Sequence, residues 1–269
     1  MVQHFAEHAA SNLAAVREKK PLIHSITNLV VMNFTANVLL AMGASPVMAH
    51  ASSEVEEMVA AADGLVLNIG TLSEAWIESM LKAGKRALQQ GIPIVLDPVG
   101  AGASRLRTKT AKKIISAAPM RVIRGNASEI ISLHQAGSQT RGVESVHSVD
   151  EAAPAAKNLA QALKTTLAIT GPEDLLTDGT RVIRVCNGHP LMGFVSGTGC
   201  AATAIIAAFL AVDDDPLRAA AGALAFLGAA GEVAAENASA PGSFMIQMID
   251  ALYAMTPEAL KQKCRIYGD

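Results

Sequence analysis

Short apolar runs alternate with longer segments of helical periodicity over about two thirds of the chain. The apolar runs predict strands, and each ends in a turn rich in glycine, proline or asparagine: 65–69, 92–97, 121–123 and 166–170. The periodic segments predict helices at 29–42, 53–62, 73–90, 104–117 and 150–164. Strands that alternate with helices of this length are typical of βαβ units, and continuous apolar strands are typical of a sheet covered on both faces.

The pattern changes after residue 170. Two short runs, 175–178 and 181–186, flank Gly179 and predict a hairpin. After Gly197 the chain reads as helical to its end, at 200–212, 216–238, 243–255 and 257–264. Pro216 and Pro257 suit the first turns of their helices. We therefore expect an α/β fold with a central, mostly parallel sheet covered by helices on both faces and a helical C-terminal region.

No linker or internal repeat divides the chain, so residues 1–269 are predicted to form a single domain. The stretch 137–149, which combines serine, glutamine, glycine and histidine, is predicted to be a surface loop.

Composition narrows the classes of function. Hydrophobic residues make up 51% of the chain and charged residues 17%, which excludes a disordered protein. A net charge of −2 offers no basic field for a nucleic-acid backbone, so we expect no nucleic-acid partner. The most apolar stretch, 201–212, is shorter than the roughly 20 residues that span a bilayer, and residues 1–20 contain no apolar signal segment. Three widely spaced cysteines suit a reducing compartment, so a cytoplasmic protein without a membrane partner is expected.

The turns after the predicted strands hold the candidate chemistry. In an open α/β sheet, ligands bind beyond the carboxyl ends of the strands, so these turns are expected to share one edge. This rule brings together Asn28, Gly70, 97–102, 124–129 and Gly171.

The segment Gly197-Thr198-Gly199 runs directly into an apolar helix. Free N–H groups and the macrodipole at a helix N-terminus attract anions, and glycine lets the backbone approach a phosphate closely. The alternative is a tight turn before a helix. A dinucleotide fingerprint is rejected because two long helices follow instead of a second strand, and the chain has no GxxxxGK[ST] phosphate loop.

Three further side chains have both a chemical and a structural interpretation. Cys200 lies in the first turn of that helix, a position that favours a thiolate, but a free cysteine can equally be a small buried hydrophobe. Asp97 ends a strand before a glycine-rich loop, where a carboxylate can organise Mg²⁺ near phosphates or simply begin a turn. Arg124 has the geometry to reach a phosphate. The residues after it, Asn126 to Glu129, also fit a capped surface helix.

Two other features have weaker chemical interpretations. His4-Phe5-Ala6-Glu7-His8 matches the zinc motif HxxEH, but it lies at the chain terminus without a third ligand, so a solvated first helix is the better interpretation. Met48, in the strand-like stretch 45–49, places a thioether near the first turns, where it can face an apolar heterocycle or fill the core.

Taken together and in this order, nine segments resemble the hydroxyethylthiazole kinases of thiamin salvage, which belong to the ribokinase-like superfamily. The segments are 21–28, 34–37, 43–48, 67–72, 97–102, 124–130, 170–171, 197–200 and 241–244. The resemblance spans about residues 20–255 and departs from the family pattern in two places. Ser196 stands where threonine is usual, and Ala240 stands where glycine is usual.

The resemblance implies Mg²⁺-dependent transfer of the γ-phosphoryl group of ATP to the primary alcohol of 4-methyl-5-(2-hydroxyethyl)thiazole. It implies that Met48 and Gly197 contact the thiazole, with Asn28 close by. It further implies that the backbone from Gly197 through Thr198 and Gly199 to Cys200 forms the anion hole. Cys200 stands where most ribokinase-like relatives carry a catalytic aspartate.

The resemblance also assigns the nucleotide and metal sites. Arg124 and Thr170 correspond to ATP-binding residues, and Asp97 and Glu129 to the Mg²⁺ carboxylates. The family is homotrimeric, with each thiazole site at a subunit interface, so a homotrimer is expected.

Three other functions share parts of this pattern. The first is a related kinase of a pyrimidine or pyridoxal alcohol, against which Met48 and the segment 26–28 favour thiazole. The second is a lyase of the same superfamily, a nucleotide-dependent hydrate dehydratase, but those enzymes carry aspartate at the position of Cys200. The third is a nucleotide sensor without turnover, which the intact set of Asp97, Glu129, Arg124 and Cys200 disfavours.

Overall fold

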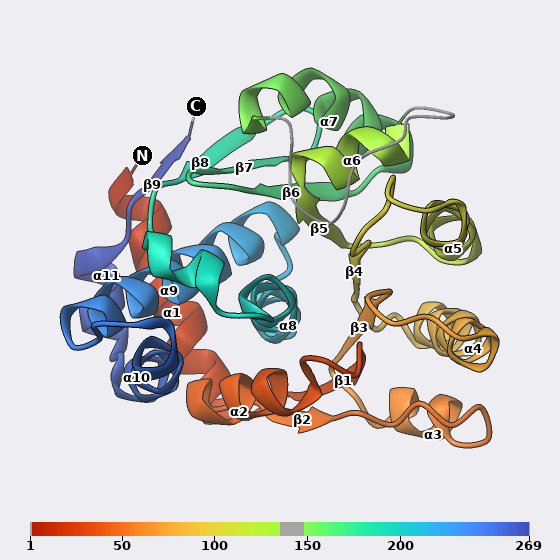
Figure 1. Ribbon diagram of the computed structural model, residues 1–269, viewed down its shortest axis with the longest axis horizontal. Helices are drawn as coiled ribbons and strands as arrows, with labels where there is room; N and C mark the ends of the chain where they lie inside the picture. Colours follow the sequence, from red (N-terminus) through yellow and green to blue (C-terminus); the bar gives the residue numbers. More distant parts are fainter. Residues whose placement is uncertain (1, 135–147, 269) are drawn as a thin grey trace.

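The computed structural model describes residues 2–134 and 148–268. Across these residues the strands form one sheet of nine, in the order β2-β1-β3-β4-β5-β6-β7-β8-β9 (Figure 1). The strands are β1 (Leu22–Ile26), β2 (Ser45–Val47), β3 (Gly64–Asn68), β4 (Ile94–Asp97), β5 (Val122–Asn126), β6 (Thr166–Thr170), β7 (Asp174–Thr177), β8 (Val182–Val185) and β9 (Ile266–Gly268). From β2 to β6 all neighbours are parallel, and β7, β8 and β9 are each antiparallel to the strand before them in this order.

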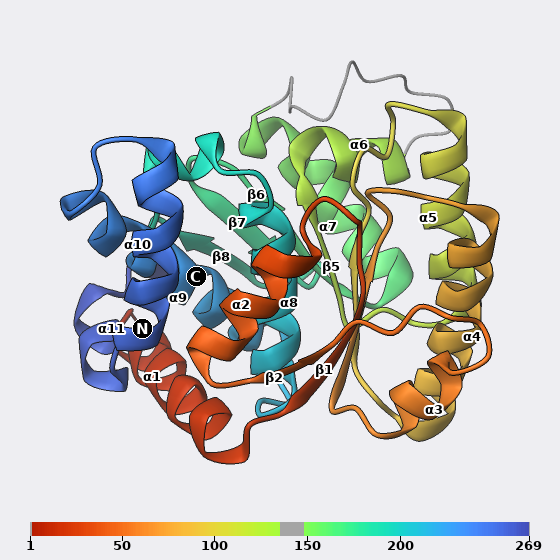
Figure 2. The ribbon, with the colours of Figure 1, turned by 60° about the horizontal axis from the view of Figure 1, so that its bottom comes forward.

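Helices cover both faces of the sheet (Figures 1 and 2). The helices on one face are α1 (Val2–Lys19), α2 (Met32–Met42), α8 (Thr198–Leu210), α9 (Pro216–Glu236), α10 (Pro241–Ala254) and α11 (Pro257–Lys263), of which α10 and α11 pack on the other helices. The other face packs against α3 (Val55–Ala60), α4 (Glu74–Gln90), α5 (Arg105–Ala117), α6 (Ala127–His134) and α7 (Val149–Leu163). A short 3₁₀ helix, η1 (Pro190–Phe194), precedes α8.

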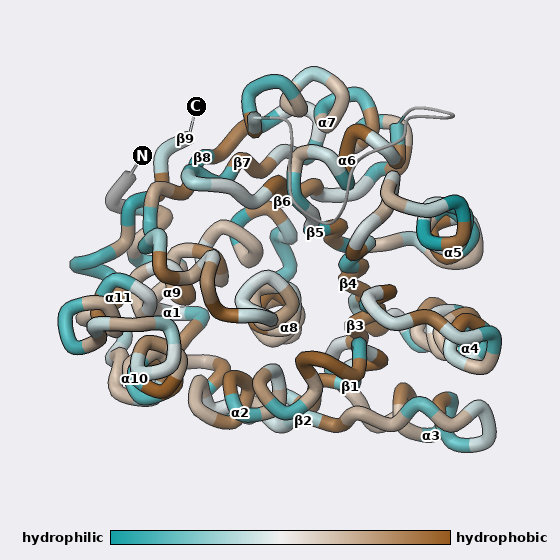
Figure 3. The backbone as a smooth tube through the Cα atoms, in the orientation of Figure 1, coloured by the Kyte–Doolittle hydropathy of each residue, from teal (hydrophilic) through white to brown (hydrophobic). Residues whose placement is uncertain are grey.

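Alternation along each strand divides the core into two layers. In β4, Val95 belongs to the layer under α8 and α9, whereas Leu96 belongs to the layer under α4 and α5. Because successive side chains point to opposite faces, Asp97 then points back toward α8. The hydropathy of the chain follows this arrangement, with brown, hydrophobic strands between the helices in Figure 3.

The core layer under α8 and α9 is built largely from small side chains, which let these two helices pack closely. By length and composition, α9 could cross a membrane. Among the described residues, the longest apolar segment is therefore α9 and not the stretch 201–212 that was singled out in the sequence. However, 83% of the apolar window of α9 is buried inside the protein, as expected for the core helix of a globular fold.

The predicted α/β architecture is confirmed, including the hairpin, which is formed by β7 and β8. The prediction of helix to the end of the chain is wrong, because Ile266–Gly268 form β9 against β8. The first helix is not simply solvated, since Leu13 and Val16 of α1 are fully buried. Of the loop predicted at 137–149, only the last two residues are described, and they begin α7. The rest lies outside the described residues.

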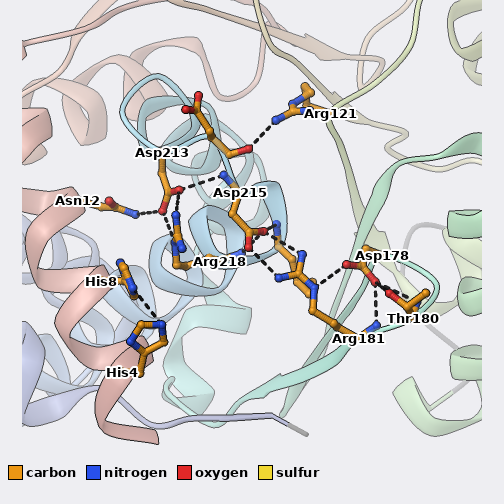
Figure 4. Close-up of polar contacts among 12 residues, drawn as sticks. His4, His8, Asn12, Arg121, Asp178, Thr180, Arg181, Asp213, Asp215 and Arg218 are labelled. Carbon is orange, nitrogen blue, oxygen red and sulfur yellow. Dashed lines mark hydrogen bonds and ion pairs between the residues drawn. The ribbon is translucent and has the colours of Figure 1, made fainter. Parts of the chain in front are cut away.

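A polar network joins elements at the amino ends of the strands (Figure 4). Asp213 accepts hydrogen bonds from Asn12 of α1, at 2.7 Å, and from Arg218 of α9. Arg181, next to the β7–β8 turn, pairs with both Asp178 and Asp215. These contacts hold together the edge of the sheet opposite the candidate site.

Candidate active site

Polar side chains from four neighbouring strands gather at the carboxyl edge of the sheet. Asn68 ends β3 and pairs in register with Asp97, which ends β4. Arg124 of β5 and Thr170 of β6 continue the row, and the Arg124 guanidinium donates a hydrogen bond to Thr170 Oγ1. Because side chains alternate along a strand, these four point to the face that α8 covers. The N-terminus of α8 therefore lies over them.

The α8 N-terminus has the geometry of an anion site. Gly197 caps the helix at φ +96°, a conformation that suits glycine, and the first-turn N–H groups have no acceptors within the helix. A Cβ atom on Gly199 would lie 2.6 Å from Arg124 Nη1, so the guanidinium packs directly against the backbone there. Thr198 anchors the turn by donating from Oγ1 to the carbonyl of Met192, at 3.0 Å.

Cys200 lies beneath this turn, beside two amides. Asn68 Nδ2 and Asn28 Nδ2 are 3.2 and 3.5 Å from Cys200 Sγ. Burial, followed by the charge of Asp97, raises the pKa of the Cys200 thiol to about 12. This shift favours the thiol over the thiolate, because burial and a nearby carboxylate outweigh the amide donors.

Asp97 is completely buried at the centre of this site. Its Oδ2 accepts hydrogen bonds from Asn68 Nδ2, at 2.8 Å, and from Thr203 Oγ1, at 2.9 Å. Its Oδ1 has no hydrogen-bond partner and lies 3.8 Å from Arg124 Nη1. Burial raises the pKa of Asp97, although Arg124 and these donors oppose the shift. A buried carboxylate oxygen without a hydrogen bond is a suitable ligand for a cation.

Glu129 lies in the first turn of α6 and is buried. Its two oxygens accept from the backbone N–H groups of Gly100, at 2.7 Å, and Asn126, at 2.8 Å. Asn126 Oδ1 in turn accepts from the Glu129 N–H, so α6 is capped reciprocally but is not the surface helix of the alternative interpretation. Burial, followed by the charge of Asp97, raises the pKa of Glu129 to about 7.

Asp97 and Glu129 suit a cation that substrate phosphates also help to hold. They do not form a site in which protein side chains alone would hold a metal ion. Asp97 repels the charge on Glu129, and a cation would relieve that repulsion. Over residues 2–134 and 148–268, no group of three or more His, Cys, Asp or Glu side chains has the geometry of a metal site. Mg²⁺ in nucleotide enzymes is typically held by one or two carboxylates together with substrate phosphates, which is what this pair can offer.

A cavity of about 480 Å³ opens beside the row of polar residues. Arg124, Thr170, Thr198 and Gly199 line one part of it. Another part is apolar and is lined by Ala202, Leu224 and Leu227 of α8 and α9, with Pro190 and Met192 of η1. A cationic part joined to an apolar part suits a ligand with a phosphate chain and a flat base.

A family model described as the hydroxyethylthiazole kinase family matches residues 13–258 of the chain. The chain belongs to the hydroxyethylthiazole kinase family. A hydroxyethylthiazole kinase of Desulfotalea psychrophila (strain LSv54 / DSM 12343) is 64% identical over 258 residues, which cover 96% of this chain and 94% of that protein.

A solved structure agrees with this assignment, and a more distant one shares the fold. The structure of a hydroxyethylthiazole kinase protein from Pyrococcus horikoshii OT3 is 43% identical, with a TM-score of 0.88 and coverage of 97% of this chain and 98% of that one. A ribokinase-like superfamily protein from Enterococcus faecalis V583 shares 14% identity, with a TM-score of 0.61 over 90% and 88% of the two chains, and shows the fold alone. The resemblance seen in the sequence is thus confirmed, and the chain is a kinase of the hydroxyethylthiazole kinase family.

Not every residue assigned by the family resemblance meets at the cavity. Asn28 contacts Cys200 and Asn68, but neither Asn28 nor Met48 lines the cavity of about 480 Å³. Met48 is half-buried just beyond β2, at the end of the sheet. The carbonyl of the next residue, Ala49, accepts a 2.8 Å hydrogen bond from the buried His24 Nε2, which holds this segment against β1.

Asn68 and Thr203 were not predicted as site residues. Asn68 uses all four of its hydrogen-bonding positions, because Oδ1 accepts from Asn28 Nδ2 and the Gly70 N–H while Nδ2 donates to Asp97 and Cys200. A signal was available for Asn68, since it is a polar residue at a strand end before Gly70. Thr203 carries no such signal, because it lies inside an apolar helix.

The HxxEH segment of α1 lies beside the polar network of Asn12, Asp213 and Arg218 (Figure 4). His4 Nε2 and His8 Nε2 are 3.2 Å apart on one side of the helix. Burial, followed by the charge of Arg218, lowers the pKa of His8. A nearby cationic side chain disfavours a metal ion at this position.

Proposed function

We propose that this kinase transfers the γ-phosphoryl group of ATP to the hydroxyl of 4-methyl-5-(2-hydroxyethyl)thiazole, a reaction of thiamin salvage. The observation that supports this most directly is the meeting of the first turn of α8, the Arg124 guanidinium and the Asp97 carboxylate beside Cys200. Reduced cysteines and the use of ATP support a cytoplasmic location.

Phosphoryl transfer passes through a loose transition state, so positioning and charge stabilisation matter more than a strong base. The N–H groups at residues 198–200 and the Arg124 guanidinium would meet the negative charge on the transferred group. Thr170 holds Arg124 in place through its hydroxyl. Asp97 and Glu129 would hold Mg²⁺, a cation that neutralises charge on phosphate oxygens when it is bound.

Cys200 would orient the substrate hydroxyl as a neutral thiol. Its pKa, raised to about 12, leaves little thiolate at neutral pH, so we do not assign it the role of a strong base. Because the nucleophile bonds late in a loose transition state, an oriented hydroxyl is sufficient. The side-chain amides of Asn28 and Asn68 hold the sulfur in place, with Nδ2 to Sγ distances of 3.5 and 3.2 Å.

Substituting Cys200→Asp is expected to keep activity within about tenfold of the wild type, because a carboxylate can also orient the hydroxyl by accepting its hydrogen bond. The amides of Asn28 and Asn68 are placed to donate to such a carboxylate. Cys200→Ala, which cannot orient the hydroxyl, should lose about 10²-fold in kcat. Steady-state ADP release with the thiazole alcohol measures both. A folded Cys200→Asp protein without turnover would count against this role for Cys200.

The activity itself is tested by measuring ADP release from Mg-ATP across hydroxyethylthiazole, hydroxymethylpyrimidine, pyridoxal and ribose, with the product identified by mass spectrometry. Turnover confined to hydroxyethylthiazole supports the proposal. Turnover on a different alcohol would support the related pyrimidine or pyridoxal kinase and would make the assignment of Met48 and Asn28 wrong.

We also propose a homotrimer with each thiazole site at a subunit interface. Large apolar side chains are exposed on the β1–α2 loop, η1 and α10, namely Leu29, Val30, Phe194 and Ile246. This region adjoins the site, since the position of a Cβ on Gly197 would touch Val31 and Phe34. Exposed apolar side chains of this kind are typical of an interface. Analytical ultracentrifugation is expected to give three times the mass of one chain, and a monomer at micromolar concentration would contradict it.

A further inference from the structure

The cavity contains one acidic side chain that the family resemblance leaves without a role. Asp174, the first residue of β7, lines the cavity and is only 9% exposed. Leu176, two residues later, belongs to the core layer under α9. Because side chains alternate along a strand, Asp174 points to the same face, toward α9 and the cavity.

Only one Asp174 oxygen is used by the protein. Oδ1 accepts the Gly171 N–H at 3.0 Å, across the turn between β6 and β7. Within the described parts of the chain, no other hydrogen bond or ion pair reaches this carboxylate, and its second oxygen is not sealed inside the core. The second oxygen is thus an acceptor open to the cavity. Burial raises the pKa of Asp174 to about 7, which is consistent with a carboxylate that lacks a second donor.

The position of Asp174 in the cavity decides which part of a nucleotide it can meet. Arg124 donates a hydrogen bond to Thr170, and the N–H of the next residue, Gly171, donates to Asp174, so Asp174 lies near the residues that suit phosphates. The phosphates themselves carry no hydrogen-bond donors and would repel a carboxylate. The base would suit the apolar side chains of the lining, which include Leu224 and Leu227. The ribose lies between phosphates and base, and its hydroxyls are donors.

We propose that Asp174 is a specificity-determining residue that accepts a hydrogen bond from a ribose hydroxyl of the nucleotide and so selects ribonucleotides over deoxyribonucleotides. Carboxylates bind ribose hydroxyls in the same way in dinucleotide-binding folds. The inference rests on the proposed use of ATP and extends it to the sugar.

Two variants separate this role from the role of Asp174 in the turn. Asp174→Asn keeps one oxygen for the Gly171 N–H but replaces the open acceptor with an amide N–H₂ group. Glu173→Gln is the matched control, because it makes the same change of charge one residue earlier, on a side chain that bonds Arg184 outside the cavity. Thermal denaturation establishes that each variant is folded.

Calorimetry in Mg²⁺ buffer measures the binding of ADP, 2′-deoxy-ADP and 3′-deoxy-ADP to the full chain. The wild type and Glu173→Gln are expected to bind ADP about tenfold more tightly than the analogue that lacks the contacted hydroxyl. Asp174→Asn is expected to bind ADP and that analogue equally. In kinetics with ATP, its KM should rise about tenfold while kcat changes little, whereas a turn defect alone would weaken all nucleotides alike.

The outcomes are distinct. Equal binding of the three nucleotides by the wild type, or an unchanged preference in Asp174→Asn, would overturn the inference and leave the proposed kinase activity intact. Preference for the ribonucleotide without phosphorylation of the thiazole alcohol would overturn the proposed substrate and support the role of Asp174. A wild type that binds none of the three nucleotides would overturn both.

Discussion

Gly199→Val is expected to lower kcat/KM by on the order of 10³-fold while the protein stays folded. A Cβ at this position would stand 2.6 Å from Arg124 Nη1 and 2.8 Å from Arg124 Nη2, so even the first carbon of the new side chain displaces the guanidinium. The remaining valine carbons would occupy the space in front of the first-turn N–H groups. One substitution thus removes both a cation and the close backbone approach on which an anion site depends.

Steady-state kinetics with ATP and the thiazole alcohol, alongside circular dichroism, test this expectation. Gly199→Ala adds only the first carbon and should have a smaller effect, because a flexible arginine can shift. Lys113→Val, which puts a β-branched side chain on the exposed face of α5, is the control and should change turnover by less than about threefold. Near-normal turnover in a folded Gly199→Val protein would rule out the anion site at the start of α8.

The edge of the sheet that carries the site was predictable because it depends on local pattern. The apolar runs that became β3, β4 and β6 are bounded by turn residues, and parallel strands put their carboxyl ends together. That rule alone is enough to place Asp97 and Arg124 close to each other. β9 was not predictable in this way. It is three residues long and, among the described residues, pairs with β8 alone, so its existence depends on where the rest of the chain places β8.

The pKa of Cys200, like the existence of β9, could not be predicted from the local sequence. Its position in the first turn of α8 is visible in the sequence, and that position alone favours a thiolate. The opposite shift in its pKa comes from burial and from Asp97, which is more than a hundred residues away in the chain. Likewise, Asp174 directly precedes the strand predicted at 175–178 and carries no signal of a function until the packing of β7 against α9 places it in the cavity. Contacts between distant segments decide these properties, and no local pattern encodes them.

Asp97→Asn is expected to abolish most activity, by 10³-fold or on that order, because the variant loses the buried carboxylate oxygen that would hold Mg²⁺. The amide oxygen can still accept from Asn68 and Thr203, so the hydrogen bonds that pack this residue survive the change. Asp63→Asn, on an exposed aspartate at the opposite edge of the sheet, is the control and should leave turnover unchanged.

Stability should move in the opposite direction from activity. Burial raises the pKa of Asp97 above its value in the unfolded chain, so folding binds a proton more tightly at this site. The stability that this site contributes is present below the unfolded pKa and is lost as the pH rises through the folded pKa. Ionising the buried carboxylate as the pH rises therefore costs free energy of folding, and the neutral asparagine does not carry this cost. Urea denaturation at pH 7 without Mg²⁺ should show Asp97→Asn to be as stable as the wild type or more stable, by at most about 2 kcal/mol. Adding Mg-ADP should then stabilise the wild type far more than the variant. A variant that is less stable yet still turns over would mean that Asp97 serves the fold and not the transfer of phosphate.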